Sequence, residues 1–102
     1  LVVRFNAAEP AARAQYTALA RDAGLVAAGA SEAASLEALL AFLARCLDAA
    51  GIAAELGAHG VRAEGVPLLA EEASRQWTAQ FNPRPVGRAE FAELLGSALR
   101  AE

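Results

Sequence analysis

The fold of this chain is decided by residues 31–50, which read SEAASLEALLAFLARCLDAA. Apolar side chains recur there three or four residues apart, namely Leu36, Leu39, Leu40, Leu43, Cys46 and Leu47. This spacing places them on one side of an α-helix. The opposite side carries Glu37, Ala41, Arg45 and Asp48. The stretch therefore predicts an amphipathic helix over 31–50, with the leucines in the core and Gly51 as its end.

Helical periodicity extends over the rest of the chain, and no run alternates apolar with polar residues as a half-buried strand would. Upstream, a helix is expected from Ala8 or Pro10 to Ala23, with Gly24 as its end. Asn6 and Glu9 are spaced as a capping pair at its start. Its expected apolar face carries Tyr16, Leu19, Ala20 and Ala23. Its expected solvated stripe carries Glu9, Arg13, Thr17 and Arg21, with Glu9 and Arg13 spaced as a weak ion pair.

The helical pieces downstream of residue 50 are shorter. A turn is expected over 53–56, closed by Gly57 and followed by a connector over 58–61. A helix should begin between Ala63 and Val66 and end near Arg75, because a helix tolerates Pro67 in its first turn. Its inward side is expected to carry Val66, Leu69, Ala70 and Ala73.

Two prolines separate that helix from the last one. Pro83 and Pro85 each bias the preceding residue toward an extended backbone, so no helix should cross 80–86. A last helix is expected over about 88–100, with Gly87 as N-cap and Glu90 three residues on. Its apolar face carries Phe91, Leu94, Leu95, Ala98 and Leu99. These patterns predict an all-α chain, a bundle-like array of about five helices that forms a single domain over 1–102.

The composition is typical of a small soluble protein. The chain has 102 residues, 56% of them apolar, a net charge of −3 and one cysteine. Charged residues interrupt the 31–50 stretch, so no run approaches the roughly 18 apolar residues of a membrane span. The nine basic residues are scattered singly, which argues against a nucleic-acid surface. We expect a cytoplasmic protein without nucleic-acid or membrane partners. The start of the chain lacks a signal-peptide pattern, and the missing methionine hints at a trimmed chain.

Residue types that usually carry chemistry are sparse. The chain has one histidine, His59, and no metal-ligand pair, glycine-rich phosphate loop or Gly-x-Ser-x-Gly motif. His59 could act as a base or ligand, but a lone histidine without an orienting partner is more typical of ordinary surface. Cys46 could be a reactive thiol, but its place on the leucine stripe favours core packing. We expect no catalytic, cofactor-binding or metal-ligating residue here.

The segment 77–82, WTAQFN, holds the only tryptophan and stands between two predicted helices. Trp77 and Phe81 could fill the gap where helices converge, as large aromatic side chains commonly do. They could equally form, with Thr78, one wall of a substrate pocket, because ligand contacts concentrate in loops held by rigid elements. Trp77, Thr78 and Phe81 are therefore the candidate pocket residues.

The stretch Asn82-Pro83-Arg84-Pro85-Val86, followed by a helix with an acidic first turn, resembles the C-terminal part of iron-containing alcohol dehydrogenases. Other segments match that family in its order over nearly the whole chain. They are Val3-Arg4-Phe5-Asn6, Gly51-Ile52, Leu56-Gly57, Gly60-Val61 and Val66-Pro67-Leu68-Leu69-Ala70-Glu71-Glu72-Ala73. The chain departs from the family's pattern at Ala53, usually proline, at Gly87, usually a Ser or Thr cap, and at Thr78, often a cysteine near the substrate. The departure at Thr78 leaves the substrate class open.

The resemblance implies a two-domain parent enzyme. Its N-terminal α/β domain would bind NAD(P), and an Asp and three His upstream of Leu1 would hold iron or another divalent metal in a dehydroquinate synthase-like helical domain. This chain would be the C-terminal part of that helical domain. It would supply scaffold and one pocket wall for a small alcohol or carbonyl substrate, pack against the missing N-terminal and upstream helical parts, and be inactive alone.

Two other interpretations stay open. The Asn-Pro-Arg-Pro motif also occurs in the related maleylacetate reductases, so the parent could act on their substrate instead. The chain could also be an independent helical module that binds a protein partner through an apolar groove. A piece severed from its neighbours should expose apolar surface, so we expect self-association of the chain alone.

Overall fold

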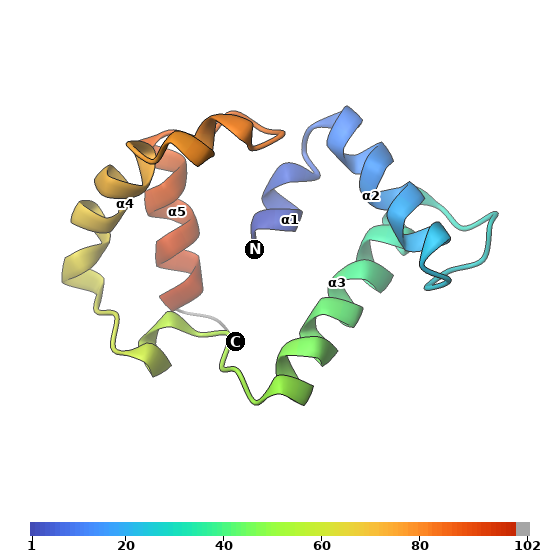
Figure 1. The fold of residues 1–102 in the computed structure, drawn as a ribbon, viewed down its shortest axis with the longest axis horizontal. Coiled ribbons are helices and arrows are strands. Elements are labelled where there is room, and N and C mark those ends of the chain that lie inside the picture. The colour runs from blue at the N-terminus through green and yellow to red at the C-terminus, as the bar shows by residue number, and fades with distance from the viewer. Residues whose placement is uncertain (100–102) are drawn as a thin grey trace. The chain divides into compact units, whose positions relative to one another are not determined.

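The computed structural model describes residues 1–99, and within them the chain is helical without a strand (Figure 1). The α-helices are α1 (Val2–Asn6), α2 (Pro10–Asp22), α3 (Glu32–Ala50), α4 (Val66–Ser74) and α5 (Arg88–Leu99). Three short 3₁₀ helices join them: η1 (Leu56–His59), η2 (Ala63–Gly65) and η3 (Trp77–Phe81). The prediction of an all-α chain with about five helices is confirmed. The predicted end of the last helix at Arg100 lies outside the described residues.

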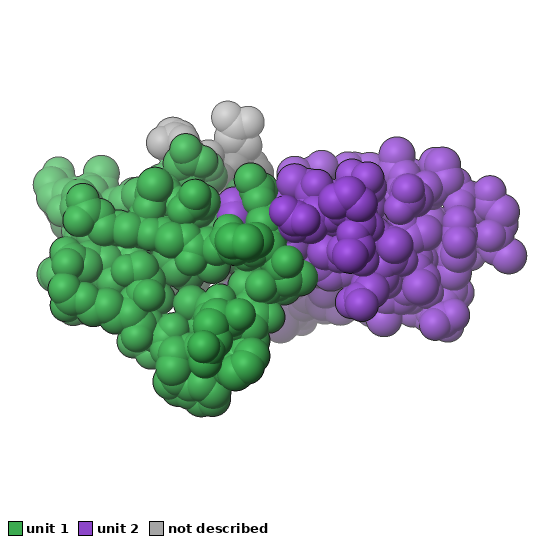
Figure 2. Space-filling model, turned by 90° about the horizontal axis from the view of Figure 1, so that it is seen from above, with its two compact units in different colours: residues 1–2, 53–102 green, residues 3–52 purple. Residues whose placement is uncertain are grey.

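The chain divides into two compact units (Figure 2). One comprises residues 3–52 and contains the pair of α2 and α3. The other comprises residues 1–2 and 53–102 and contains α4 packed on α5, with η1 also against α5. We expected the helices to pack as one bundle-like array. The structure shows one helix pair within each unit, α2 with α3 and α4 with α5. The single domain over 1–102 stays a prediction.

Helix α3 begins and ends where its sequence signals predicted. The Ser31 hydroxyl accepts a hydrogen bond from the Ala34 N–H at 3.1 Å, which satisfies one free donor of the first turn. At the other end Gly51 adopts φ +68°, and the Ile52 N–H donates to the Leu47 carbonyl at 3.0 Å. This is the Schellman pattern, which favours glycine because its left-handed backbone carries no Cβ penalty.

The side of α2 that faces α3 differs from the predicted one. Thr17 is buried together with Ala12 and Ala20, whereas Leu19 is 52% exposed. Our apolar face was wrong in Leu19 and in Ala23, which is exposed beyond the end of α2, and our solvated stripe was wrong in Thr17. The buried positions carry small side chains, and the Thr17 hydroxyl is satisfied inside the helix because it donates to the Arg13 carbonyl at 2.9 Å.

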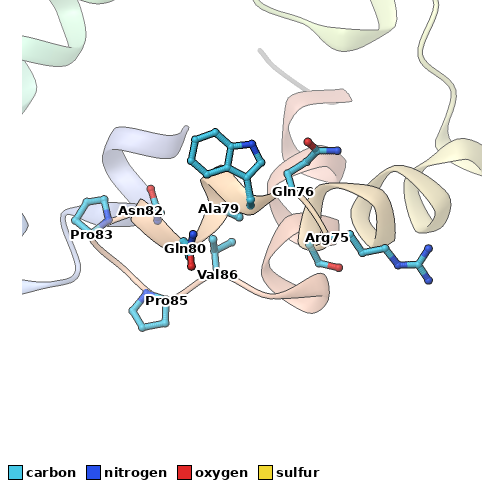
Figure 3. A pocket seen from close by; sticks show the side chains of 10 residues that line it. Arg75, Gln76, Ala79, Gln80, Asn82, Pro83, Pro85 and Val86 are labelled. Atoms are coloured by element: carbon cyan, nitrogen blue, oxygen red, sulfur yellow. The ribbon is translucent and has the colours of Figure 1, made fainter.

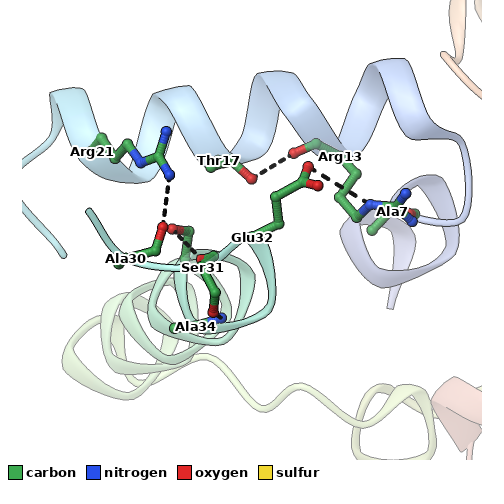
Figure 4. A network of polar contacts seen from close by, with 9 residues as sticks. Ala7, Arg13, Thr17, Arg21, Ala30, Ser31, Glu32 and Ala34 are labelled. Carbon is green, nitrogen blue, oxygen red and sulfur yellow. Dashed lines mark hydrogen bonds and ion pairs between the residues drawn. The ribbon is translucent and has the colours of Figure 1, made fainter. Parts of the chain in front are cut away.

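Two arginines of the expected solvated stripe bond across to the start of α3 (Figure 4). Arg21 donates to the Ala30 carbonyl at 2.6 Å, and Arg13 lies 3.8 Å from the Glu32 carboxylate. Arg13 also donates to the Ala7 carbonyl at 3.2 Å, so its partner is not the predicted Glu9. These side chains fix the position of α2 over the N-terminal end of α3.

The predicted capping pair of Asn6 and Glu9 is not formed. Asn6 is instead the last residue of α1, where it is buried and donates to the Tyr16 hydroxyl at 3.1 Å. Glu9 itself is the N-cap, without a side-chain cap, and Pro10 starts α2. Proline suits this position because the first helical N–H has no intrahelical partner. The predicted stop is confirmed, since Gly24 has φ +72°.

The leucine stripe of α3 is buried only in its N-terminal half. Leu39 is 6% exposed, whereas Phe42, Leu43 and Leu47 are 38–40% exposed and Cys46 is exposed as well. The predicted core position of Cys46 is therefore wrong. The physical reason is that the hydrogen bond and ion pair from α2, made by Arg21 and Arg13, reach only the start of α3. The side chains of the last turns of α3 therefore stay in contact with water. The Arg45 guanidinium lies over the Phe42 ring at 5.9 Å and covers part of it.

In the second unit, Ala70 of α4 is fully buried, and α4 packs along α5. The predicted turn over 53–56 was placed too early, because Glu55 is extended and the 3₁₀ turn η1 runs to His59. Gly60, with φ +85°, closes it, and Gly57 does not. Leu69, predicted to point inward, is 37% exposed. The α4 bounds agree with the prediction, with proline in the first turn.

The partial burial of α3 predicts unequal costs along one stripe. Leu39→Ala should lower the free energy of unfolding by about 2–5 kcal/mol, because it leaves a cavity among buried neighbours. Leu47→Ala, on the same helix and stripe, should cost under about 1 kcal/mol, because its side chain already contacts water. Urea unfolding of the intact chain, followed by circular dichroism, measures both. Equal losses would show that the C-terminal half of α3 is covered.

Candidate functional site

The candidate residues lie on η3, a single 3₁₀ turn between α4 and the proline loop. Gln76 is extended before the turn, with φ −69° and ψ 127°. Asn82 is extended after it, as expected for a residue that precedes Pro83. No helix crosses 80–86, as predicted, although η3 extends over its first two residues, Gln80 and Phe81. The proline loop itself runs over 82–87.

Trp77 and Phe81 contact each other on the surface of the second unit. Their ring centroids are 5.6 Å apart and their planes meet at 88°, an edge-to-face pair. Trp77 is 70% exposed and Phe81 is 68% exposed. The interpretation that they fill a gap between converging helices is therefore wrong for the described residues. Thr78, between them on the turn, is exposed as well.

An open hollow of about 600 Å³ lies beside η3 and the proline loop (Figure 3). Trp77 is the one predicted pocket residue that lines it, and Thr78 and Phe81 do not. The other lining residues are Ser74, Arg75, Gln76, Ala79, Gln80, Asn82, Pro83, Pro85 and Val86. The structure thus brings Trp77 together with the proline loop and leaves its two companions outside the hollow.

The polar side chains of the hollow include the guanidinium of Arg75 and the amides of Gln76, Gln80 and Asn82. Arg75 donates to the Glu71 carboxylate at 2.6 Å and extends away from Asn82 and Pro83 (Figure 3). The Asn82 amide donates to the Arg84 carbonyl at 2.6 Å, which holds the loop closed on itself. Gln76, which precedes η3, and Gln80, within η3, add further amide groups. Amide and indole groups can bind and orient a ligand, and none of them is a general base.

Sequence reasoning missed Gln76 and Gln80. Both line the hollow together with Trp77 and lie within three residues of it in the sequence. They were overlooked because the 3₁₀ turn over 77–81 was not predicted. Ser74 was missed too, and its hydroxyl bonds the Glu71 carbonyl at 2.6 Å.

The end of the proline loop is held by Glu90 in the first turn of α5. The Glu90 carboxylate accepts the Gly87 N–H at 2.9 Å, and the Gly87 carbonyl accepts the Phe91 N–H at 3.0 Å. This confirms Gly87 as the start of the helix. Hydrogen bonds from the backbone N–H groups of Glu90 and Gly87, with the nearby charge of Arg84, lower the pKa of the Glu90 carboxyl. A Cβ on Gly87 would lie 3.3 Å from that carboxylate.

The other two candidates from the sequence, His59 and Cys46, do not line the hollow. His59 ends η1, is exposed, and its Nε2 lies 2.8 Å from the Ala53 carbonyl, which agrees with ordinary surface. Cys46 is exposed on α3. Within residues 1–99, no three His, Cys, Asp or Glu side chains gather as a metal site would require. Over the same residues, no helix combines the length and apolarity needed to cross a membrane.

Comparison with known proteins gives no match to a protein-family model, to a curated protein or to a solved structure.

The Glu90 cap predicts a pH-dependent contribution to stability. Because the folded pKa of Glu90 lies below its ordinary value of 4.5, the carboxylate stabilises the fold above that value. The contribution is lost as pH falls through the folded pKa. Glu90→Gln should therefore show a smaller loss of stability between pH 6 and pH 3 than the unchanged chain, as measured by urea unfolding at each pH.

Glu93→Gln is the matched control, because Glu93 is an exposed carboxylate of the same helix. It should leave the pH profile close to that of the unchanged chain. A profile for Glu90→Gln that coincides with that of Glu93→Gln would contradict the cap.

Proposed function

We propose that this chain is the C-terminal helical segment of a metal-dependent, NAD(P)-linked alcohol dehydrogenase similar to the iron-containing family. In this proposal the chain provides scaffold and one wall of the substrate pocket. The metal and NAD(P) are held by residues upstream of Leu1, and the substrate is a small alcohol or carbonyl compound. The residues described here include no metal-binding group, so no step through the metal is assigned to them.

The observation that carries the proposal is the hollow beside η3. It joins Trp77 with Asn82 and Pro83, and these two residues belong to the segment that carries the family resemblance. The helix cap at Gly87 holds that segment at the start of α5. A rigid loop next to an exposed indole is the arrangement that a pocket wall requires, because ligand groups must meet fixed partners.

The other matched segments coincide with junctions of the fold. Gly51 ends α3, and Gly60 closes η1. The segment Val66–Ala73 forms most of α4. Gly51 and Gly60 thus adopt the left-handed backbone that ends a helix, and the matched proline lies in the first turn of a helix. This supports a shared local architecture at these junctions, and the dehydroquinate synthase-like arrangement of the helices is part of the proposal.

Exposed apolar side chains are the second support. Leu68, Trp77 and Phe81 are 63–70% exposed in the second unit. In the first unit, Leu19 and Ile52 are about half exposed, and the C-terminal half of α3 adds three more large side chains. Such surface is typical of a piece whose neighbours normally cover it. The proposal assigns that cover to the upstream parts of the enzyme.

The coding sequence upstream of Leu1 tests the proposal directly. A nucleotide-binding half, followed by an Asp and three His at metal-binding positions, would support it. A start codon immediately before Leu1 without a dehydrogenase domain would overturn it. That second outcome would favour an independent helical interaction module, for which the exposed face of α3 is the specific observation.

Substitution of Trp77 tests the pocket wall in the complete enzyme. Trp77→Ala should raise KM by about twofold to thirteenfold, since the loss of one aromatic contact is worth on the order of 0.5–1.5 kcal/mol. Steady-state kinetics with NAD(P) and a panel of alcohols and carbonyl compounds measure the change. The same panel, extended to maleylacetate, separates the alcohol dehydrogenases from the maleylacetate reductases.

Leu68→Ala is the control, because Leu68 is a similarly exposed apolar residue that does not line the hollow. It should leave KM and substrate preference unchanged. A stable Trp77→Ala enzyme with unchanged KM and preference would remove Trp77 from the substrate pocket.

Self-association of the chain alone is the expected consequence of its exposed apolar faces. Sedimentation equilibrium should show a mass that rises with concentration. Leu43→Asp, on the exposed stripe of α3, should reduce the rise, whereas Ala41→Asp, on the opposite side of the same helix, should not. A monomer at every concentration tested would contradict the prediction.

A further inference from the structure

We draw no further inference here: the strongest candidate, the exposed apolar face of the C-terminal half of α3 formed by Phe42, Leu43 and Leu47, carries nothing because no charge pattern or companion surface among the described residues shows what covers it.

Discussion

The close contact of small side chains is the constraint on which both units depend. Among residues 1–99, Ala20, Ser35 and Ala70 have no measurable exposure, and they lie on helices that pair with a neighbour. Small residues let two helix backbones approach, but each buries little apolar area, worth about 25 cal/mol per Å². Hydrophobic burial within either unit is therefore modest. Several large apolar side chains, among them Leu19, Leu68 and Trp77, lie at the surface, although Leu39 is buried.

With so little apolar burial, polar contacts decide how the helices begin and how they are oriented. Ser31 and Glu90 satisfy backbone donors at the starts of α3 and α5, and Arg21 joins α2 to the residue before that first cap. Arg4 adds a two-point contact with Glu37, at 2.9 and 3.3 Å, between α1 and α3. That exposed pair lowers the pKa of Glu37 through the hydrogen bond and the charge of Arg4. Exposed pairs contribute little energy, so their main effect is on geometry.

The sequence predicted helices best where the chain carries a local signal at each end. Ser31 and Gly51 bracket α3 within one residue of the prediction, because capping depends on neighbours along the chain. The buried side of a helix depends on the partner's position, which periodicity does not contain. Leu19 and Cys46 were therefore misplaced, although each shares a helical face with apolar neighbours. Residue spacing identifies a stripe, and only the packed partner decides how much of it is buried.

The candidate site shows the same division between local and tertiary information. Composition singled out Trp77, and the hollow contains it, but the 3₁₀ turn directs Thr78 and Phe81 elsewhere. An edge-to-face pair that is about 70% exposed gains little from its own contact, since both rings still face water. Its apolar surface is fully used only when an opposing surface removes that water. The hollow beside this pair is open, and in the proposed function its remaining walls come from the upstream parts of the enzyme.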